Sequence, residues 1–299
     1  MFTGLSAFPL TPMNETGIDE MALVQLLKRL ASARVDSIGV LGSTGSYVYL
    51  NREERLRVTQ LAIEYAEGIP IMIGISALRT RDVLQLAEDA QKAGANAVLL
   101  APVSYQQLTD DEVFSLYETV TKSLSIPLCV YDNPSTTQFR FSDHLHGHIA
   151  RLPIVHSIKI PGVPDFDSAK QRVEHLRAHI PKDVSIGTSG DPYAVVGLTA
   201  GCEAWYSVLG GLYPDICISI TRAALGGNSV NAERQSAFLA PLWQMFQKYG
   251  SLRVVATIAE IQGLINNPSL PLPLKSLDGV ARQELGNILA DLQLEIPLC

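Results

Sequence analysis

Two apolar runs, Pro127-Leu128-Cys129-Val130-Tyr131-Asp132-Asn133 and Ile154-Val155-His156-Ser157-Ile158-Lys159-Ile160-Pro161, show the unit from which this chain is built. Each run is short, apolar and bounded by turn-forming residues, a pattern typical of a buried β-strand. Eight such runs follow one another at a spacing of roughly 20 to 33 residues, the count that a closed parallel barrel requires. They lie near Gly4–Pro9, Ser37–Gly42, Pro70–Ser76, Ala97–Pro102, Pro127–Asn133, Ile154–Pro161, Val184–Ser189 and Ala204–Gly210.

The segments between these runs have a helical pattern. Asp19–Ala33 and Thr80–Ala93, for example, carry apolar residues at i, i+3 and i+4. The alternation predicts an α/β fold, an eight-stranded parallel (β/α) TIM barrel. A doubly wound sheet is the structural alternative, but it would require a glycine-rich phosphate turn after the first strand, and Gly4-Leu5-Ser6-Ala7-Phe8-Pro9 is no such turn.

The strand pattern stops near Asn228, and helical patterns follow at Glu233–Tyr249, Ser251–Ile265 and Gly279–Leu292. The proline-rich piece Pro268–Leu274 between the last two is predicted to be a linker of fixed φ that serves packing or subunit contact. We therefore predict a barrel domain over residues 1–227 and a carboxy-terminal helical domain over residues 228–299.

Composition excludes several classes of function. The chain has 299 residues and a formal net charge of -7, so no basic stripe is available to bind nucleic acid. The start, Met1-Phe2-Thr3-Gly4-Leu5, does not resemble a signal peptide, and no run reaches the roughly 18 apolar residues of a membrane span, so we expect a cytoplasmic protein without a membrane partner. The cysteines are widely spaced and are predicted to be core residues, at positions Cys129, Cys202, Cys217 and Cys299.

One histidine cluster has the spacing of metal ligands. His144 and His148 would share a helix face, with His146 between them. Because Ser142 is a good N-cap and the histidines alternate with Leu145 and Gly147, we interpret the segment as a solvated helix start and predict no metal site.

Lys159 is the most informative residue, because it lies inside an apolar strand bounded by Pro153 and Pro161. Burial favours the neutral form of an amine, and a neutral amine attacks ketones to give a Schiff base. In the alternative interpretation, Lys159 reaches solvent or pairs with Asp132 or Asp191.

Other candidate residues end neighbouring strands, where the chemistry of such barrels gathers. The turn Gly42-Ser43-Thr44-Gly45-Ser46 offers hydroxyls and backbone N–H groups to a carboxylate. Tyr131 ends the fifth run, and its phenol can carry protons for the dehydration step of Schiff-base formation if the fifth and sixth strands are neighbours.

The motifs Gly42-Ser43-Thr44-Gly45, Tyr131 with Asn133-Pro134-Ser135, Ile158-Lys159 and Ser189-Gly190-Asp191 occur in an order and spacing that resembles the dihydrodipicolinate synthase and N-acetylneuraminate lyase family. The resemblance covers essentially the whole chain, including the helical tail. It implies a class I lyase or aldolase that binds a 2-keto acid and an aldehyde, forms a homotetramer or homodimer, and uses no cofactor beyond the covalent Schiff base.

The resemblance also implies roles for single residues. Lys159 would form the Schiff base, Tyr131 and Ser43 would relay protons, and Tyr105 would supply a second relay phenol. Thr44 and Gly190 would contact the keto acid, and Tyr206 would narrow or polarise the pocket where the family commonly has an aliphatic residue.

Two departures bear on the substrate. Thr136 stands where true synthases have the arginine that binds aspartate semialdehyde, and Ser46 replaces the family's acid. Arg140, Arg79 and Arg81 offer charge for an anionic second substrate, but because exposed arginines near helix starts are ordinary, solvation is the favoured interpretation. The hydroxyl-rich pocket favours a neutral polyhydroxy or aromatic aldehyde.

Three other functions remain open at this point. One is an authentic 4-hydroxy-tetrahydrodipicolinate synthase of lysine biosynthesis. The second is a phosphate-binding barrel isomerase or epimerase, with Gly187-Thr188-Ser189-Gly190 as the phosphate cradle. The third is a catalytically inactive barrel that binds keto acids.

Overall fold

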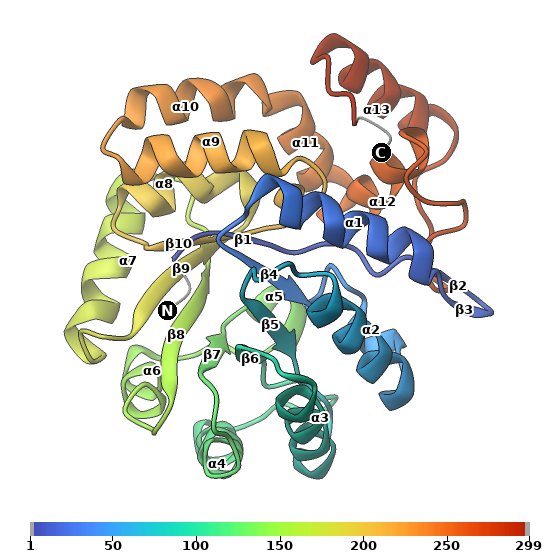
Figure 1. Cartoon of the computed structure of the whole chain (residues 1–299). Coiled ribbons are helices and arrows are strands. Elements are labelled where there is room, and N and C mark those ends of the chain that lie inside the picture. The colour runs from blue at the N-terminus through green and yellow to red at the C-terminus, as the bar shows by residue number, and fades with distance from the viewer. Residues whose placement is uncertain (1–2, 297–299) are drawn as a thin grey trace.

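The computed structural model describes residues 3–296, and its central feature is a closed barrel of parallel strands (Figure 1). The strand order around the barrel is β1-β10-β9-β8-β7-β6-β5-β4, so that β1 closes the ring by pairing with both β10 and β4. The barrel strands are β1 (Gly4–Ala7), β4 (Ser37–Val40), β5 (Ile71–Gly74), β6 (Ala97–Leu100), β7 (Leu128–Tyr131), β8 (Val155–Pro161), β9 (Ser185–Ser189) and β10 (Ala204–Ser207). A small hairpin, β2 (Met13–Asn14) with β3 (Gly17–Ile18), follows β1.

Helices surround the barrel and continue beyond it (Figure 1). Those within the barrel repeat are α1 (Glu20–Ala33), α2 (Arg52–Glu64), α3 (Thr80–Ala93), α4 (Asp110–Thr121), α5 (Pro134–Thr137), α6 (Asp143–Ile149), α7 (Phe166–His179), α8 (Ala194–Thr199) and α9 (Pro214–Leu225). The tail contains α10 (Ser229–Phe238), α11 (Ala240–Tyr249), α12 (Ser251–Ile261) and α13 (Gly279–Asp291). In Figure 1, α10 runs beside α9, and α13 lies at the far end of the tail.

The predicted eight-stranded barrel with a helical tail is confirmed. Each predicted strand range contains one barrel strand, and most strands stop earlier than predicted because their last residues pass into the loops that carry the site. The single helical pattern Glu233–Tyr249 was wrong in one respect, since the chain divides there into α10 and α11 around Leu239. Pro241, in the first turn of α11, has no N–H with which to continue the hydrogen bonds of α10.

Alternate residues of the strands face two different layers. Val130, Ile158 and Ile186 belong to the large apolar layer that the strands share with the helices. The inner layer is smaller and includes Tyr131 and Tyr206 along with several short side chains. Because side chains alternate along a strand, Tyr131 and Lys159 point into the barrel while Val130 and Ile158 point out of it.

A buried carboxylate connects two helices of the tail with the proline-rich linker. Glu260 of α12 accepts a hydrogen bond from Ser269 Oγ at 2.7 Å and forms an ion pair with Arg282 of α13 at 2.7 Å. Ser269 also accepts a backbone hydrogen bond from Met13 in β2. The proline-rich linker therefore packs within the chain, between the tail helices and the hairpin.

Cys129, Cys202 and Cys217 are buried free thiols, as predicted, and Cys299 lies outside the described residues. Over residues 3–296, none of the helices is both long and apolar enough to cross a bilayer.

The close approach of β4 and β5 leads to a stability prediction. A Cβ at Gly74 would lie 1.8 Å from the Leu41 carbonyl oxygen, a backbone atom that no rotamer change can move. We expect Gly74→Ala to lower the free energy of unfolding by about 3 kcal/mol or more. Urea denaturation followed by circular dichroism measures the loss.

Gly286→Ala is the matched control inside helix α13, because among the described residues no atom beyond its chain neighbours and the adjoining helix backbone lies within 4 Å of the added Cβ. It is expected to stabilise the chain by about 0.5 to 1 kcal/mol through helix propensity. Equal stability of the parent and Gly74→Ala would contradict the packing described here.

Candidate active site

The site begins with the pairing of β7 and β8. Tyr131 lies opposite Lys159, and Lys159 lies opposite Gly187 of β9. This register depends on a bulge: Leu128 pairs with Val155 but the next residue, Cys129, pairs with Ser157, so β8 contributes one extra residue. Regular pairing would have placed Tyr131 opposite the outward-facing Ile158. The bulge thus brings the phenol and the amine to the same inner layer.

The amine of Lys159 faces aromatic rings. The residue is 6% exposed, and its Nζ lies 4.1 Å from the ring centroid of Phe8, 4.3 Å from that of Tyr131 and 5.3 Å from that of Tyr206. Across residues 3–296, no carboxylate forms a salt bridge with this amine. A buried amine at the mouth of a barrel strand is a suitable nucleophile for a ketone.

The alternative partners named for Lys159 are engaged elsewhere. Asp191 accepts hydrogen bonds from Trp205 Nε1 at 3.0 Å and from the backbone N–H of Leu209 at 2.6 Å. Asp132 points away from the barrel interior toward His146. The interpretation of Lys159 as a snorkelling or ion-paired strand-end lysine was therefore wrong.

The phenol of Tyr131 is held by two polar side chains. Its Oη lies 3.1 Å from Ser43 Oγ, in the turn after β4, and accepts a hydrogen bond of 2.9 Å from Asn133 Nδ2. Ser135 Oγ in turn donates to Asn133 Oδ1 at 2.7 Å. These contacts give the phenol a defined position from which a proton can pass to and from Ser43.

The turn after β4 forms one wall of the site. Ser43 is half-buried and Thr44 is buried. Ser46 adopts a left-handed conformation, and its Oγ has no hydrogen-bond partner among the residues described. Ser46 therefore offers a bound carboxylate only a hydroxyl and no charge. The Ser43 hydroxyl, by contrast, already contacts the Tyr131 phenol.

The remaining predicted residues are not all assembled around Lys159. Gly190, with a φ of +84°, is exposed after β9, and Thr136 is exposed on α5. Tyr105 is 90% exposed in the loop after β6, and this chain by itself does not bring it to the buried amine. Tyr206 is 1% exposed inside the barrel. The roles assigned to these four residues stay predictions.

Sequence reasoning missed Phe8 and Asn133. Phe8 rests against Gly39, where an added Cβ would lie 2.3 Å from the phenyl Cζ. A glycine inside a strand often marks such a close approach, so Gly39 was the available signal. Asn133 belongs to a motif that was recognised, but its hydrogen bond to Tyr131 requires the turn into α5, which the motif alone does not specify.

Known proteins resemble this chain in both sequence and fold. The sequence matches the model of the dihydrodipicolinate synthetase family over residues 1–292. The chain belongs to that family. It is 42% identical to dihydrodipicolinate synthase from Agrobacterium tumefaciens, whose crystal structure matches with a TM-score of 0.94 over 97% of this chain and 98% of that one. It is 26% identical to the 4-hydroxy-tetrahydrodipicolinate synthase of Rickettsia rickettsii, over 99% of each protein.

A third relative has been crystallised with a ligand. The Acinetobacter baumannii dihydrodipicolinate synthase, described as chloride-inhibited and complexed with pyruvate, has a TM-score of 0.90 at 24% identity, over 98% of this chain and 100% of that one. As a member of the dihydrodipicolinate synthetase family, this chain is a class I, Schiff-base-forming aldolase or lyase.

In this family member, the segment Gly187–Gly190 does not form an open phosphate cradle. Thr188 Oγ1 and Ser189 Oγ both donate to backbone carbonyls, and the Tyr206 ring covers Gly187. The hydroxyls that a phosphate would require are therefore occupied.

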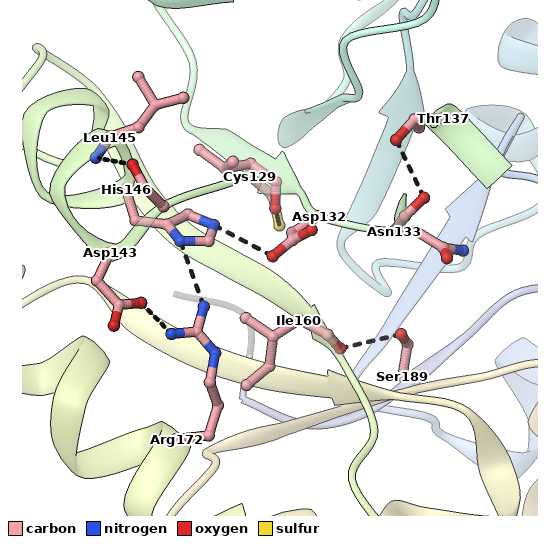
Figure 2. A network of polar contacts seen from close by, with 12 residues as sticks. Cys129, Asp132, Asn133, Thr137, Asp143, Leu145, His146, Ile160, Arg172 and Ser189 are labelled. Carbon is pink, nitrogen blue, oxygen red and sulfur yellow. Dashed lines mark hydrogen bonds and ion pairs between the residues drawn. The ribbon is translucent and has the colours of Figure 1, made fainter. Parts of the chain in front are cut away.

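A buried polar network lies on the other side of β7 (Figure 2). His146 of α6 stacks on Phe141 and places its Nε2 3.5 Å from Asp132 Oδ2, while its Nδ1 lies 3.4 Å from Arg172 Nη2. Arg172 also pairs with Asp143. Because a guanidinium only donates, His146 Nδ1 accepts from Arg172 and the ring proton lies on Nε2, facing Asp132.

The interpretation of the histidine cluster as solvated was wrong for His146. Ser142 caps the helix and His144 and His148 are exposed, as predicted, but His146 is fully buried. Within the described chain, no three histidine, cysteine or acidic side chains are grouped to bind a metal ion. His146 packs and forms hydrogen bonds inside the protein because it lies on the inward face of the short helix α6.

Both partners in this network prefer their neutral forms. Burial raises the pKa of Asp132 to about 7, partly opposed by the charges of Arg172 and Arg140. Burial and the charge of Arg172 lower the pKa of His146 to about 3. At pH 5 to 6 the contact is therefore a neutral one and not an ion pair.

These shifts predict how stability depends on pH. The pKa of Asp132 is 3.8 in the unfolded reference and about 7 in the fold, so its ionisation destabilises the fold progressively as the pH rises from about 4 to 7. We expect Asp132→Asn to gain stability relative to the parent over that interval, by up to about 4 kcal/mol at pH 7 compared with pH 4. Urea denaturation at each pH measures the difference.

Asp183→Asn, at an exposed position before β9, is the matched control and should follow the parent curve. His146→Phe should show the opposite slope, gaining stability relative to the parent as the pH falls from about 6.5 to 3, because the parent resists protonation of the buried imidazole. Parallel pH curves for all four proteins would contradict the neutral pair.

Proposed function

We propose that Lys159 forms a Schiff base with the C2 ketone of pyruvate or a related 2-keto acid. The observation that supports this role most strongly is the buried Lys159 amine beside the hydrogen-bonded Tyr131–Ser43 pair. The neutral amine attacks C2, and the carbonyl oxygen becomes the hydroxyl of a carbinolamine. One further proton, delivered through Tyr131, lets that hydroxyl leave as water, and the nitrogen keeps one proton as a cationic iminium.

The turn after β4 is the proposed site for the keto-acid carboxylate. Ser43 and Thr44 offer hydroxyls there, with the backbone N–H groups of the same turn as further donors. Gly190 lies beyond β9 without a side chain to obstruct the ligand, and its φ of +84° suits glycine. The pyruvate complex of the Acinetobacter baumannii relative supports the choice of ligand.

The iminium acts as an electron sink for bond cleavage or formation. When the C3–C4 bond breaks, the C4 hydroxyl gives up its proton and becomes the carbonyl of the leaving aldehyde, while the electrons of the bond move into the iminium to give a neutral enamine. In the synthetic direction the enamine attacks an aldehyde, whose oxygen takes up a proton, and the iminium is regenerated. The same side chains serve both directions.

We further propose that the second substrate is a neutral polyhydroxy or aromatic aldehyde. Thr136 is exposed on α5, where the predicted correspondence with true synthases requires an arginine. Arg140, Arg79 and Arg81 are exposed, as predicted, and Arg81 already contacts Asp82. An aldehyde that carries its own carboxylate would therefore lack a bidentate partner at Thr136.

A homodimer or homotetramer is the proposed assembly. The loops after the neighbouring strands β4, β5 and β6 expose large apolar side chains at the catalytic end of the barrel. These side chains are Val48, Tyr49, Leu78 and Tyr105. A second copy packed there would remove them from water, and would give exposed Tyr105 a defined environment in which its predicted relay role could be exercised.

The Schiff base is tested by intact mass after incubation with pyruvate and borohydride. We expect a pyruvate-sized adduct on the parent chain and none on Lys159→Ala, because borohydride reduces only an imine to a stable product. Lys182→Ala, at an exposed lysine, is the matched control and should retain the adduct. An adduct of equal yield on Lys159→Ala would contradict the assignment.

The second substrate is tested with a panel of aldehydes. The parent should turn over neutral hydroxyaldehydes faster than aspartate semialdehyde, and Thr136→Arg should raise kcat/KM for aspartate semialdehyde by about tenfold or more, since a charge-assisted pair is restored. Thr136→Gln, which adds length without charge, should not. Adduct formation without turnover of any aldehyde would favour the inactive keto-acid-binding protein, and efficient turnover of aspartate semialdehyde alone would favour the authentic synthase.

A further inference from the structure

We propose that Phe8, Tyr131 and Tyr206 form an aromatic box that holds the positive charge of Lys159, first as ammonium and then as iminium, in place of a carboxylate counter-ion. The proposal rests on the Schiff-base function given above. It assigns Tyr206 a role beyond narrowing the pocket, because its ring is one of the three faces that meet the amine.

Tyr206 is anchored as the floor of the site. Its Oη lies 2.7 Å from Ser157 Oγ and 3.5 Å from Cys129 Sγ. Ser157 and Cys129 each precede the inward residues Lys159 and Tyr131 by two positions, so they lie one layer deeper in the barrel. The Tyr206 side chain therefore starts on β10 and crosses beneath the amine to β7 and β8. Ser185 Oγ donates to Ser157 Oγ at 2.9 Å and extends the anchor to β9.

Two strand glycines make room for the rings. An added Cβ at Gly187, which lies opposite Lys159, would stand 2.3 Å from Tyr206 Cε2. An added Cβ at Gly39 would stand 2.3 Å from Phe8 Cζ. Phe8 and Tyr206 meet edge to face, with centroids 5.9 Å apart and an interplanar angle of 81°. Each ring thus packs directly on a glycine, Tyr206 on Gly187 and Phe8 on Gly39. These contacts fix the positions of both rings relative to Lys159.

The box contains no fixed negative charge. The titratable groups that face Lys159 are Tyr131, Tyr206 and Cys129, and burial raises the pKa of Tyr206 and Cys129. Asp132, the nearest carboxylate along β7, faces His146 on the other side of the strand. Ring faces attract cations through the quadrupole of the π system, so they stabilise the ammonium and the iminium alike.

Stabilising both cations has a measurable signature. Trapping of the pyruvate adduct by cyanoborohydride accelerates as the amine loses its proton, and slows at higher pH as the iminium loses its own. A plot of trapping rate against pH therefore has a rising limb, set by the amine, and a falling limb, set by the iminium. Removing a ring makes both protons easier to lose and should move both limbs to lower pH together. A purely structural defect lowers the rate without moving either limb.

The experiment compares the full-length parent with Tyr206→Leu, Tyr206→Phe and Phe8→Leu, using cyanoborohydride and pyruvate across a pH series with intact-mass detection. Tyr206→Leu should shift both limbs down by about 0.5 to 1.5 pH units, and Phe8→Leu by at least as much, because its ring is nearer the amine. Tyr206→Phe keeps the ring and should keep both limbs in place, whatever its absolute rate.

Phe8→Leu decides the matter alone if thermal melting shows that Tyr206→Leu does not fold. Limbs that stay fixed in the folded leucine variants, while the adduct still forms, overturn the aromatic box and leave the Schiff base standing. Absence of any adduct on the parent overturns the proposed function and the box with it.

Discussion

The pairing of β7 with β8 is the constraint on which the site depends. The bulge after Leu128 adds one residue to β8, and this single residue decides that Lys159, rather than Ile158, lies opposite Tyr131. The backbone N–H of Asp132 then donates to the Lys159 carbonyl and closes the pairing at the catalytic end of the barrel. The amine, the phenol and the Ser43 hydroxyl all take their positions from this register.

The inner and outer faces of β7 each adjoin a buried ionisable side chain, and the two side chains have different surroundings. On the inner face, Lys159 is a basic group with aromatic rings around it, and none of the carboxylates in residues 3–296 forms a salt bridge with it. On the outer face, Asp132 is an acidic group whose neighbour, His146, is itself held neutral by burial and by Arg172. Burial sets the protonation preference of the outer pair, whereas the inner face has polarisable surfaces that tolerate a charge formed during reaction.

Much of the fold could be predicted because its evidence is local. Short apolar runs separated by helical segments are readable from a single sequence, and the barrel follows from their number. Lys159, Tyr131 and Ser43 could also be singled out, because a lysine in a buried strand is unusual and strand ends carry the chemistry of such barrels. The structure brings the Ser43 hydroxyl and the Lys159 amine to the Tyr131 side chain.

The rest depended on information that no local pattern contains. Phe8 reaches the amine because Gly39, on a different strand, leaves space for its ring. His146 is buried because α6 lies against α4 and α7 and because Phe141 stacks on the imidazole, which the flanking residues of His146 do not reveal. Tyr105 is exposed in the loop after β6, and its neighbours in the sequence give no sign of that exposure.

The closure of the barrel has a consequence for the order in which the chain can fold. β1 pairs with β10, and Met13 near the start of the chain bonds to Ser269 near its end, so the first strand has no complete set of neighbours until the last ones exist. On a ribosome, the strands from β1 to β9 form at most an open sheet, whose edges at β1 and β9 are exposed to other chains until β10 is made. Closure of the barrel waits for β10, which ends at Ser207, and contacts this distant in sequence make folding slow. A chaperone that shields those edges would act on this protein mainly before its tail has been synthesised.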